Sequence, residues 1–148
     1  MIAFDTNILV YAQLESDPQD RHHKANELIA ATIGISAIVS MQVIGEFLNV
    51  CHRKLGRSPQ QAIEQVNDYL VAFSCPQTES QDLFDAAMLA NRHGLQFFDA
   101  LIVCVASRCG ARALLSEDMH DGHVLADVMI VNPFNPANAK IVADFYAA

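Results

Sequence analysis

Four acidic residues on four separate segments are the features of this sequence that point most directly to chemistry. They are Asp5 in FDTNIL, Glu46 in QVIGEF, Asp99 in FFDALI and Asp118 in LLSEDMHDG. Each interrupts or adjoins an apolar stretch, where a carboxylate is costly unless it is paired, hydrogen-bonded or bound to metal. Carboxylate oxygens are the ligands that hard cations such as Mg²⁺ prefer. The pattern therefore predicts a multi-carboxylate metal site.

The segments around these acids predict short strands that alternate with helices. Apolar runs predict strands at 2–4, 34–39, 113–115 and 128–131. Helical spacing, N-cap residues and terminal glycines predict helices from residue 7 and over 20–31, 41–55, 59–73, 80–93, 99–109 and 136–148. Such alternation indicates an α/β fold, in which a parallel sheet is covered on both faces. We expect one domain over residues 1–148.

This arrangement brings the acids toward one edge of the sheet. Asp5 directly follows the first strand, and Asp118 follows the strand at 113–115 after Ser-Glu. In sheets of this kind, ligands bind beyond the carboxyl ends of the strands. Glu46 lies within one helix and Asp99 at the start of another, positions from which both side chains can reach that edge.

Composition and charge limit the class of protein. The chain is 52% hydrophobic and 18% charged, which is typical of a packed globular protein. Its net charge of −8 is unusual for a nucleic-acid binder, but a bound divalent ion can reverse the local field. We expect no secretory signal, because no basic stretch precedes the first apolar run, and no membrane span, because the run at 100–106 is too short.

Cysteine and histidine do not offer a second metal site. The cysteines form no CxxC pair and have no histidine at zinc-finger spacing, so we interpret them as reduced, buried thiols of a cytoplasmic protein. The histidines show no convincing metal spacing either and are expected at the surface or in turns. His120 lies beside the last acidic motif and is a candidate general base.

Taken in order, the four acidic motifs resemble those of the PIN domain. DTNILVY resembles the opening D-x-N motif, QVIGEF carries the acid of the mid-chain helix, and FFDALI resembles the F-x-D-A-x-I segment. LLSEDMHDG followed by VNPF resembles the closing segment of many small bacterial members, so the resemblance runs from residue 1 to about 134. It implies a three-layer α/β/α sandwich around a short parallel sheet. It also implies a metal-dependent ribonuclease, often a VapC-like toxin paired with an antitoxin.

The resemblance gives each acid an expected role. Asp5 and Asp99 are expected to be the primary ligands of Mg²⁺ or Mn²⁺, while Glu46 and Asp118 complete the site directly or through water. Asp118 aligns best with the family's fourth acid, whereas Asp121 either assists or caps the turn that follows it. Candidates to orient water or phosphate are Thr6, Asn7 and Ser116.

A path for the RNA substrate is suggested by basic residues beyond Glu46. They lie at the end of the same helix and just after it: Arg53, Lys54 and Arg57. Arg53 is about two turns from Glu46 and shares its face, so these residues can follow an RNA backbone away from the metal. Alternatively, they complement the dipole at the end of the helix.

Other interpretations stay open for these residues. Asp5 and Asp99 can each cap a helix, Glu46 can be an exposed helical residue, and Asp118 can belong to a turn. A phosphatase of the haloacid dehalogenase type also begins with a strand and an Asp, but it has a second Asp where this chain has Asn7. A housekeeping RNA-processing nuclease or a non-catalytic PIN-fold binding module are further alternatives. The hydrophobic composition also leads us to expect a homodimer.

Overall fold

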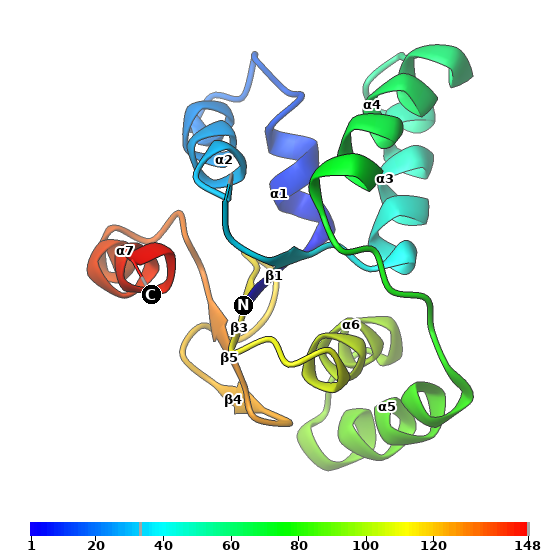
Figure 1. Ribbon diagram of the computed structural model, residues 1–148, viewed down its shortest axis with the longest axis vertical. Coiled ribbons are helices and arrows are strands. Elements are labelled where there is room, and N and C mark those ends of the chain that lie inside the picture. The colour runs from blue at the N-terminus through cyan, green and yellow to red at the C-terminus, as the bar shows by residue number, and fades with distance from the viewer. Residues whose placement is uncertain (33, 148) are drawn as a thin grey trace.

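A computed structural model describes residues 1–32 and 34–147 of the chain, which form a single mixed sheet with helices packed around it (Figure 1). In chain order the elements are β1 Ile2–Phe4, α1 Thr6–Tyr11, α2 Arg21–Ala30, β2 Ala37–Ile38, α3 Met41–Arg53, α4 Pro59–Ala72, α5 Ser80–His93, α6 Phe97–Arg108, β3 Ala113–Leu115, β4 Val124–Leu125, β5 Val128–Val131, a 3₁₀ turn Pro136–Asn138 and α7 Ala139–Ala147. The expected α/β class is therefore confirmed.

The sheet has five strands in the order β2-β1-β3-β5-β4. The strand β1 lies beside β2 and β3, with Ile2 opposite Ala113 and Phe4 opposite Leu115, and both pairings are parallel. The strand β5 continues the parallel arrangement next to β3, and only β4 runs antiparallel. As a result, the carboxyl ends of β1, β2, β3 and β5 lie at the same edge of the sheet.

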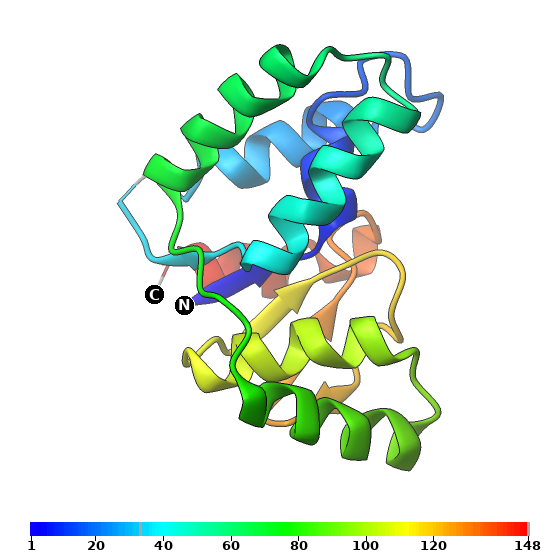
Figure 2. The same cartoon turned by 90° about the vertical axis from the view of Figure 1, so that its right-hand side faces the viewer.

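Helices cover both faces of this sheet, which confirms the three-layer arrangement. Figure 1 shows α5 and α6 on one side of the strands and α7 on the other, while α1 to α4 gather near the β2 end. In Figure 2 the arrows of β1 and β3 point the same way, with α3 above them and α6 below them in this view. The segments that carry the four acids therefore surround one end of the strands.

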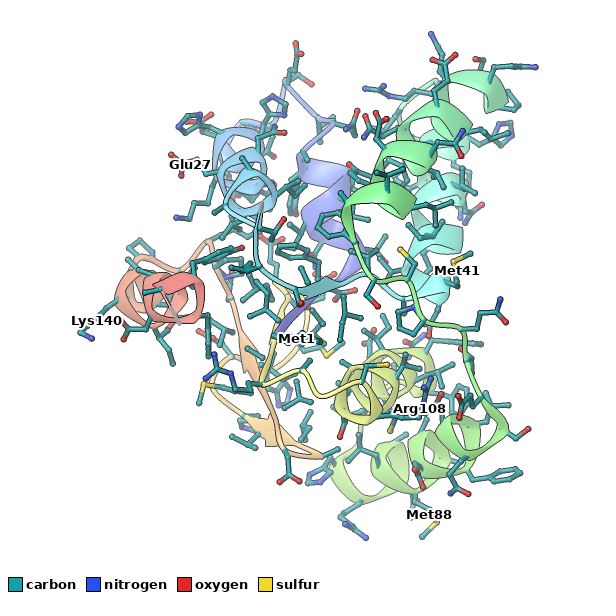
Figure 3. All side chains as sticks on the ribbon, in the orientation of Figure 1. Met1, Glu27, Met41, Met88, Arg108 and Lys140 are labelled. Atoms are coloured by element: carbon teal, nitrogen blue, oxygen red, sulfur yellow. The ribbon has the colours of Figure 1, made fainter. Side chains whose placement is uncertain are left out.

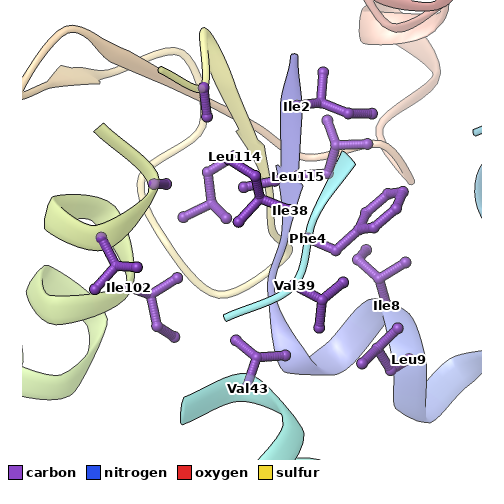
Figure 4. Close-up of a cluster of buried hydrophobic side chains, with 14 of the residues drawn as sticks. Ile2, Phe4, Ile8, Leu9, Ile38, Val39, Val43, Ile102, Leu114 and Leu115 are labelled. Carbon is purple, nitrogen blue, oxygen red and sulfur yellow. The ribbon is translucent and has the colours of Figure 1, made fainter. Parts of the chain in front are cut away.

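The core consists of short apolar strands that are buried on both faces. All three residues of β1 are buried, and so are all three of β3. Figure 4 shows side chains of β1, α1, β2, α3, α6 and β3 packed together. All four cysteines are free thiols, as the sequence indicated, and two of them belong to this core.

The helix α6 is buried over residues 100–106, yet no helix of the described ranges is long and apolar enough to span a bilayer.

Three details differ from the sequence-based expectations. The strand expected at 34–39 is confined to Ala37–Ile38, and the strand Val124–Leu125 was not predicted. The helix α6 begins at Phe97, two residues earlier than expected, which places Asp99 within its first turn rather than at its first residue. A carboxylate in the first turn is still favourable, because the positive end of the helix dipole lies there.

Candidate active site

Asp5 is the most buried of the four acids and lies where β1 passes into α1. Its backbone N–H donates to the carbonyl oxygen of Leu115, which continues the pairing of β1 with β3. One carboxylate oxygen accepts a hydrogen bond from the Thr6 backbone N–H at 2.7 Å, and the other accepts from Ser116 Oγ at 2.6 Å. Asp5 is only 4% exposed, so it caps the helix and also faces the interior of the site.

This environment makes the charged form of Asp5 unfavourable. Burial raises the pKa of Asp5 to about 6, while the hydrogen bonds from Ser116 and Thr6 act in the opposite direction. The nearby carboxylates of Asp99 and Glu46 raise the pKa further. A simple helix cap has its charge stabilised by the helix dipole and by donors. Asp5 therefore lies in a setting that favours a cation or a proton.

Asp99, on α6, shows the same electrostatic pattern as Asp5. It occupies the first turn of α6 and is half-buried. Burial is the main reason that its pKa is raised, and the carboxylates of Asp118 and Glu46 add to the effect. The acids of β1, α3, α6 and the segment after β3 thus affect one another's charge, as expected for a shared site.

Glu46 connects three helices around this site. On α3 it lies one turn after Gln42, whose Nε2 donates to Glu46 Oε1 at 2.9 Å. The hydroxyl of Thr6, from α1, donates to the other oxygen of Glu46. The same Gln42 amide also donates to the carbonyl oxygen of Phe98 on α6, at 3.0 Å. Glu46 is half-buried and is therefore not the freely exposed helical residue of the alternative interpretation.

Asp118 follows β3 and is the most exposed of the four acids. Its Oδ2 accepts a hydrogen bond from Asn7 Nδ2 at 3.0 Å. Its backbone N–H donates to Ser116 Oγ at 3.2 Å, the same hydroxyl that donates to Asp5. All three residues expected to orient water or phosphate thus contact the acids: Thr6, Asn7 and Ser116.

Asp121 has a different environment. Its carboxylate accepts hydrogen bonds from the backbone of Asn132 at 2.9 Å and from the side chains of Asn135 and Asn138 at 3.1 and 2.9 Å. Burial raises the pKa of Asp121, but these bonds outweigh it and the net shift is downward. Because both oxygens hold the segment after β5, the geometry favours Asp118 over Asp121 as the fourth acid.

The four acids surround the site but do not form a closed cage. Within the described ranges, no three acidic, imidazole or thiol side chains stand close enough together to form a ready metal-ligand set. Mutual repulsion and the available donors explain this, because Asp5, Glu46 and Asp118 each turn toward a hydroxyl or an amide. The four segments that carry the acids thus come together as predicted, but the carboxylate oxygens themselves do not meet at one point.

Two buried amide oxygens indicate that this site suits a hydrated cation. Asn7 Oδ1 and Gln42 Oε1 are buried and have no hydrogen-bond partner within residues 1–32 and 34–147, while their amide nitrogens donate to Asp118 and Glu46. A buried acceptor without a donor is costly. Metal-bound waters are donors, and carboxylate and amide oxygens are the ligands of Mg²⁺ and Mn²⁺. The chemistry of these side chains therefore fits the cation that the sequence predicted.

The other sequence-predicted residues lie away from the acids. His120 is exposed and packs edge-to-face on His123, with ring centroids 5.1 Å apart. Arg53 and Lys54 are exposed at the end of α3, and Arg57 donates to the carbonyl oxygen of Gln13 at 3.5 Å. These positions leave the basic residues available to a long substrate but outside the acid cluster.

Sequence reasoning missed two parts of this site. Gln42 had a detectable signal, since it precedes Glu46 by one helical turn and i,i+4 side chains are neighbours. The second part is a hydrogen-bonded group that joins Tyr11 and Arg21 to Glu117, the residue before Asp118. It had no signal, because Arg21 and Glu117 are 96 positions apart.

Comparison with known proteins identifies the family. The PIN domain family matches residues 2–120, a range that includes all four acids. Ribonuclease VapC7 of Mycobacterium tuberculosis is 30% identical over 148 residues, which cover 97% of this chain and 99% of that protein.

Solved structures share the fold at lower identity. VapC20 of Mycobacterium tuberculosis, a sarcin–ricin-loop-cleaving toxin, superposes with a TM-score of 0.68 at 20% identity, over 80% of this chain and 90% of that one. A toxin–antitoxin complex from Klebsiella pneumoniae gives 0.62 at 16% identity, over 90% of this chain and 98% of that one. These structures agree with the observed fold, and the family match over residues 2–120 together with the 30% identity to Ribonuclease VapC7 shows that the chain belongs to the PIN domain family.

Proposed function

We propose that the protein is an endoribonuclease that uses Mg²⁺ or Mn²⁺ and acts as the toxin of a toxin–antitoxin pair. The observation that carries the proposal is the grouping of Asp5, Glu46, Asp99 and Asp118 around the strand ends, beside buried amide oxygens that lack donors. The similarity to Ribonuclease VapC7 over nearly the whole chain supports RNA as the substrate. We further propose that residues 1–148 form a single PIN domain.

In this proposal Asp5 and Asp99 hold the cation, and Glu46 and Asp118 bind it directly or through water. When bound, the cation supplies an activated water and stabilises the charge on the phosphoryl group and the leaving oxygen. The Ser116 hydroxyl keeps Asp5 oriented by donating to one of its oxygens. The amide oxygens of Asn7 and Gln42, which have no donor among the described residues, would accept hydrogen bonds from waters bound to the cation.

The direct test is cleavage of RNA by the purified chain with and without divalent ions. We expect cleavage with Mg²⁺ or Mn²⁺ that stops when EDTA is added and returns when Mn²⁺ is restored. Glu27→Gln is the matched control for variants of the four acids, because it also removes one acidic charge but at an exposed position on α2. It should cleave RNA like the wild type. Undiminished cleavage in excess EDTA would contradict the metal site. Because VapC20 cleaves the sarcin–ricin loop, the RNAs tested in this assay should include that loop as well as messenger and transfer RNA.

We also propose that the end of α3 contacts the RNA backbone. A hollow of about 500 Å³ there lies between the loop after α1 and the residues after α3, and its lining includes Lys54 and Arg57. Arg53 is about 10 Å along the helix axis from Glu46, at 1.5 Å per residue. Replacing Lys54 and Arg57 by Gln should weaken RNA binding and lower its dependence on salt. An unchanged salt dependence would instead support the helix-dipole interpretation.

A toxin must be held inactive by a partner in its own cell. The Klebsiella pneumoniae relative was solved as a toxin–antitoxin complex, which supports an antitoxin here. We propose that its basic tail places an Arg or Lys among the four acids, where charge-assisted hydrogen bonds are favourable. Expression of this chain alone should slow growth, and Asp5→Asn should remove the effect. Harmless expression of the active wild type would favour a housekeeping nuclease.

We propose a cytoplasmic homodimer for the assembled toxin. The outer face of α4 supports this, because Ile63, Leu70 and Val71 are 52%, 42% and 89% exposed. The exposed residues of α2 are mostly polar, so α4 is the better candidate for the contact. Light scattering should give twice the chain mass for the wild type and a smaller mass for Val71→Glu. A wild type that is monomeric at micromolar concentration would contradict the dimer.

A further inference from the structure

Arg21 forms the centre of a charged group that lies just outside the four acids. Its guanidinium donates to both oxygens of Asp17, with Nη2 at 2.6 Å and Nε at 2.9 Å. On its other side Nη1 donates to both oxygens of Glu117, at 3.0 and 3.1 Å. The Tyr11 hydroxyl also donates to Glu117, and the Arg21 guanidinium lies 4.1 Å from the centre of the Tyr11 ring. One cation thus links α1, α2 and the segment after β3.

The start of α2 is built to keep Arg21 in this position. Asp17 accepts from both the backbone and the side chain of Arg21, and its own side chain is only 2% exposed. The Tyr11 ring, on which Arg21 lies, is itself packed edge-to-face against Phe134, with ring centroids 5.3 Å apart. Because Asp17 and the Tyr11 ring already fix the guanidinium of Arg21, little further side-chain freedom is lost when it also binds Glu117. The arrangement is therefore a rigid anchor rather than a mobile surface pair.

Glu117 connects this anchor to the catalytic acids. It lies between Ser116, which donates to Asp5, and Asp118, which accepts from Asn7. The backbone N–H of Ser116 still donates to the carbonyl oxygen of Val131 at the end of β5, at 3.0 Å, but Glu117 and Asp118 belong to no helix or strand. The backbone pairing of the sheet therefore ends before these two acids. Asp118 itself is exposed and has only an amide as its side-chain partner. The fixed side chain of Glu117 therefore supplies much of the order in this segment.

We infer that Arg21 is a positioning residue for the metal site, which acts through Glu117 to hold Asp118 in place. The inference rests on the proposed function for the identity of the site. It also explains why the closing motif contains adjacent acids. The carboxylate of Glu117 is paired with Arg21 and accepts a hydrogen bond from Tyr11, so it adds structure without adding a fifth unpaired carboxylate to the cluster.

The test measures Mn²⁺ binding by calorimetry on the protein without RNA. Glu117→Ala and Arg21→Ala should each weaken Mn²⁺ binding about tenfold, in the range seen when groups that orient metal ligands are removed. Glu117→Gln retains an acceptor for Tyr11 and Arg21 and should recover part of the loss. Lys24→Ala is the matched control, because Lys24 lies on the same helix in an exposed pair with Glu27, and it should bind Mn²⁺ like the wild type.

A double-mutant cycle separates positioning from general stability. If Glu117 acts through Asp118, then adding Glu117→Ala to Asp118→Asn should cause no further loss of Mn²⁺ affinity. Tyr11→Phe keeps the ring and removes only the hydroxyl, so it provides a mild variant if the alanine variants fold poorly, and a loss of about twofold is expected.

Several outcomes would overturn the inference. They are wild-type Mn²⁺ affinity in Glu117→Ala, fully additive losses in the double variant, and wild-type affinity in Tyr11→Phe if the alanine variants do not fold. A wild type that binds Mn²⁺ but cleaves no RNA would overturn the proposed function alone. A wild type that fails to bind Mn²⁺ would overturn both.

Discussion

Asp5 and Asp82 are equally buried carboxylates in opposite electrostatic surroundings. Asp5 is 4% exposed and Asp82 is 2% exposed. Asp82 lies on α5 and receives hydrogen bonds from Arg108 Nε at 2.9 and 3.1 Å and from Nη2 at 2.9 Å. Figure 3 shows Arg108 between α6 and α5. Asp5 instead has Asp99 and Glu46 as its charged neighbours.

The difference appears directly in the two pKa values. Burial raises the pKa of both groups, but around Asp82 the hydrogen bonds from Arg108 and the Glu79 backbone outweigh it and lower the pKa overall. Around Asp5 the hydrogen bonds are too few and its pKa is raised to about 6. The fold thus pairs the Asp82 carboxylate with a cation of its own, whereas it places the Asp5 carboxylate beside other carboxylates, where a proton or a cation is favoured. The first stabilises the fold, and we propose that the second serves the metal site.

The largest expected effect is on activity, through Asp5→Asn or Asp99→Asn. Each keeps the shape of the side chain but removes a charge that, in the proposed function, holds the cation. RNA cleavage should fall about a thousandfold or more, because metal assistance is worth several kcal/mol of transition-state stabilisation. The thermal midpoint without metal should stay the same or rise, since repulsion within the cluster is relieved. Cleavage at the wild-type rate by either variant would show that the assignment of that acid is wrong.

Asp82→Asn should have the opposite outcome. It leaves Arg108 without its buried partner, and breaking a buried ion pair costs about 3 kcal/mol or more. We expect a lower urea midpoint with an unchanged slope, together with wild-type cleavage per folded molecule. If Asp82→Asn instead removed cleavage and kept full stability, the distinction between the two carboxylates would fail.

The free energy of unfolding should depend on pH in opposite directions for the two carboxylates, because the pKa of Asp5 is raised and that of Asp82 is lowered. Between about pH 4 and pH 6 the folded chain keeps a proton on Asp5 that the unfolded chain has already released. The free energy of unfolding of the metal-free protein should therefore fall as pH rises through this window, by about 3 kcal/mol from Asp5. Urea unfolding at several pH values measures this. The contribution of Asp5 should disappear in Asp5→Asn, which leaves the fall expected from Asp99, whose pKa is also raised. The fall should shrink when Mn²⁺ is present, and a fall of wild-type size in Asp5→Asn would contradict the assignment.

The smallest effect concerns a strained turn far from the four acids. Ala126 and Asp127 join β4 to β5 with φ values of 49° and 65°, a conformation that favours glycine or asparagine. Ala126→Gly should raise stability by about 1 kcal/mol. Because the change is remote from Asp5, cleavage and the dependence of stability on pH should remain as in the wild type. A changed pH dependence would mean that stability and the charge cluster are coupled.

The same turn illustrates why part of the fold could not be predicted. The strands β1, β3 and β5 were predictable because their apolar runs are buried on both faces. The strand β4 has two residues and is followed by Ala-Asp rather than Asn-Gly, so it carries neither periodicity nor a turn signal. The strand β2 was expected to be longer, because β-branched composition does not show where backbone pairing ends.

The site was predictable in its residue types and less so in its geometry. The four acids and the donors beside Asp5 follow from their places after strands and on helices. The orientation of Glu117 depends on a partner from the first residue of α2, and a single sequence contains no signal for such a distant pair. The separation of Asp121 from the cluster likewise depends on the Asn side chains after β5.

The place of β1 in the sheet has a consequence for how the protein is made. This strand comprises the second to fourth residues of the chain, yet its partner β3 ends at Leu115, and the hydrogen bond from Ser116 to Asp5 spans 111 positions. Contacts this distant in sequence form late in folding. During synthesis the Asp5 carboxylate therefore meets its hydrogen-bond donor only after the chain has been made as far as Ser116. A shorter nascent polypeptide lacks β3 and Ser116, so the proposed site should not form before these residues have left the ribosome.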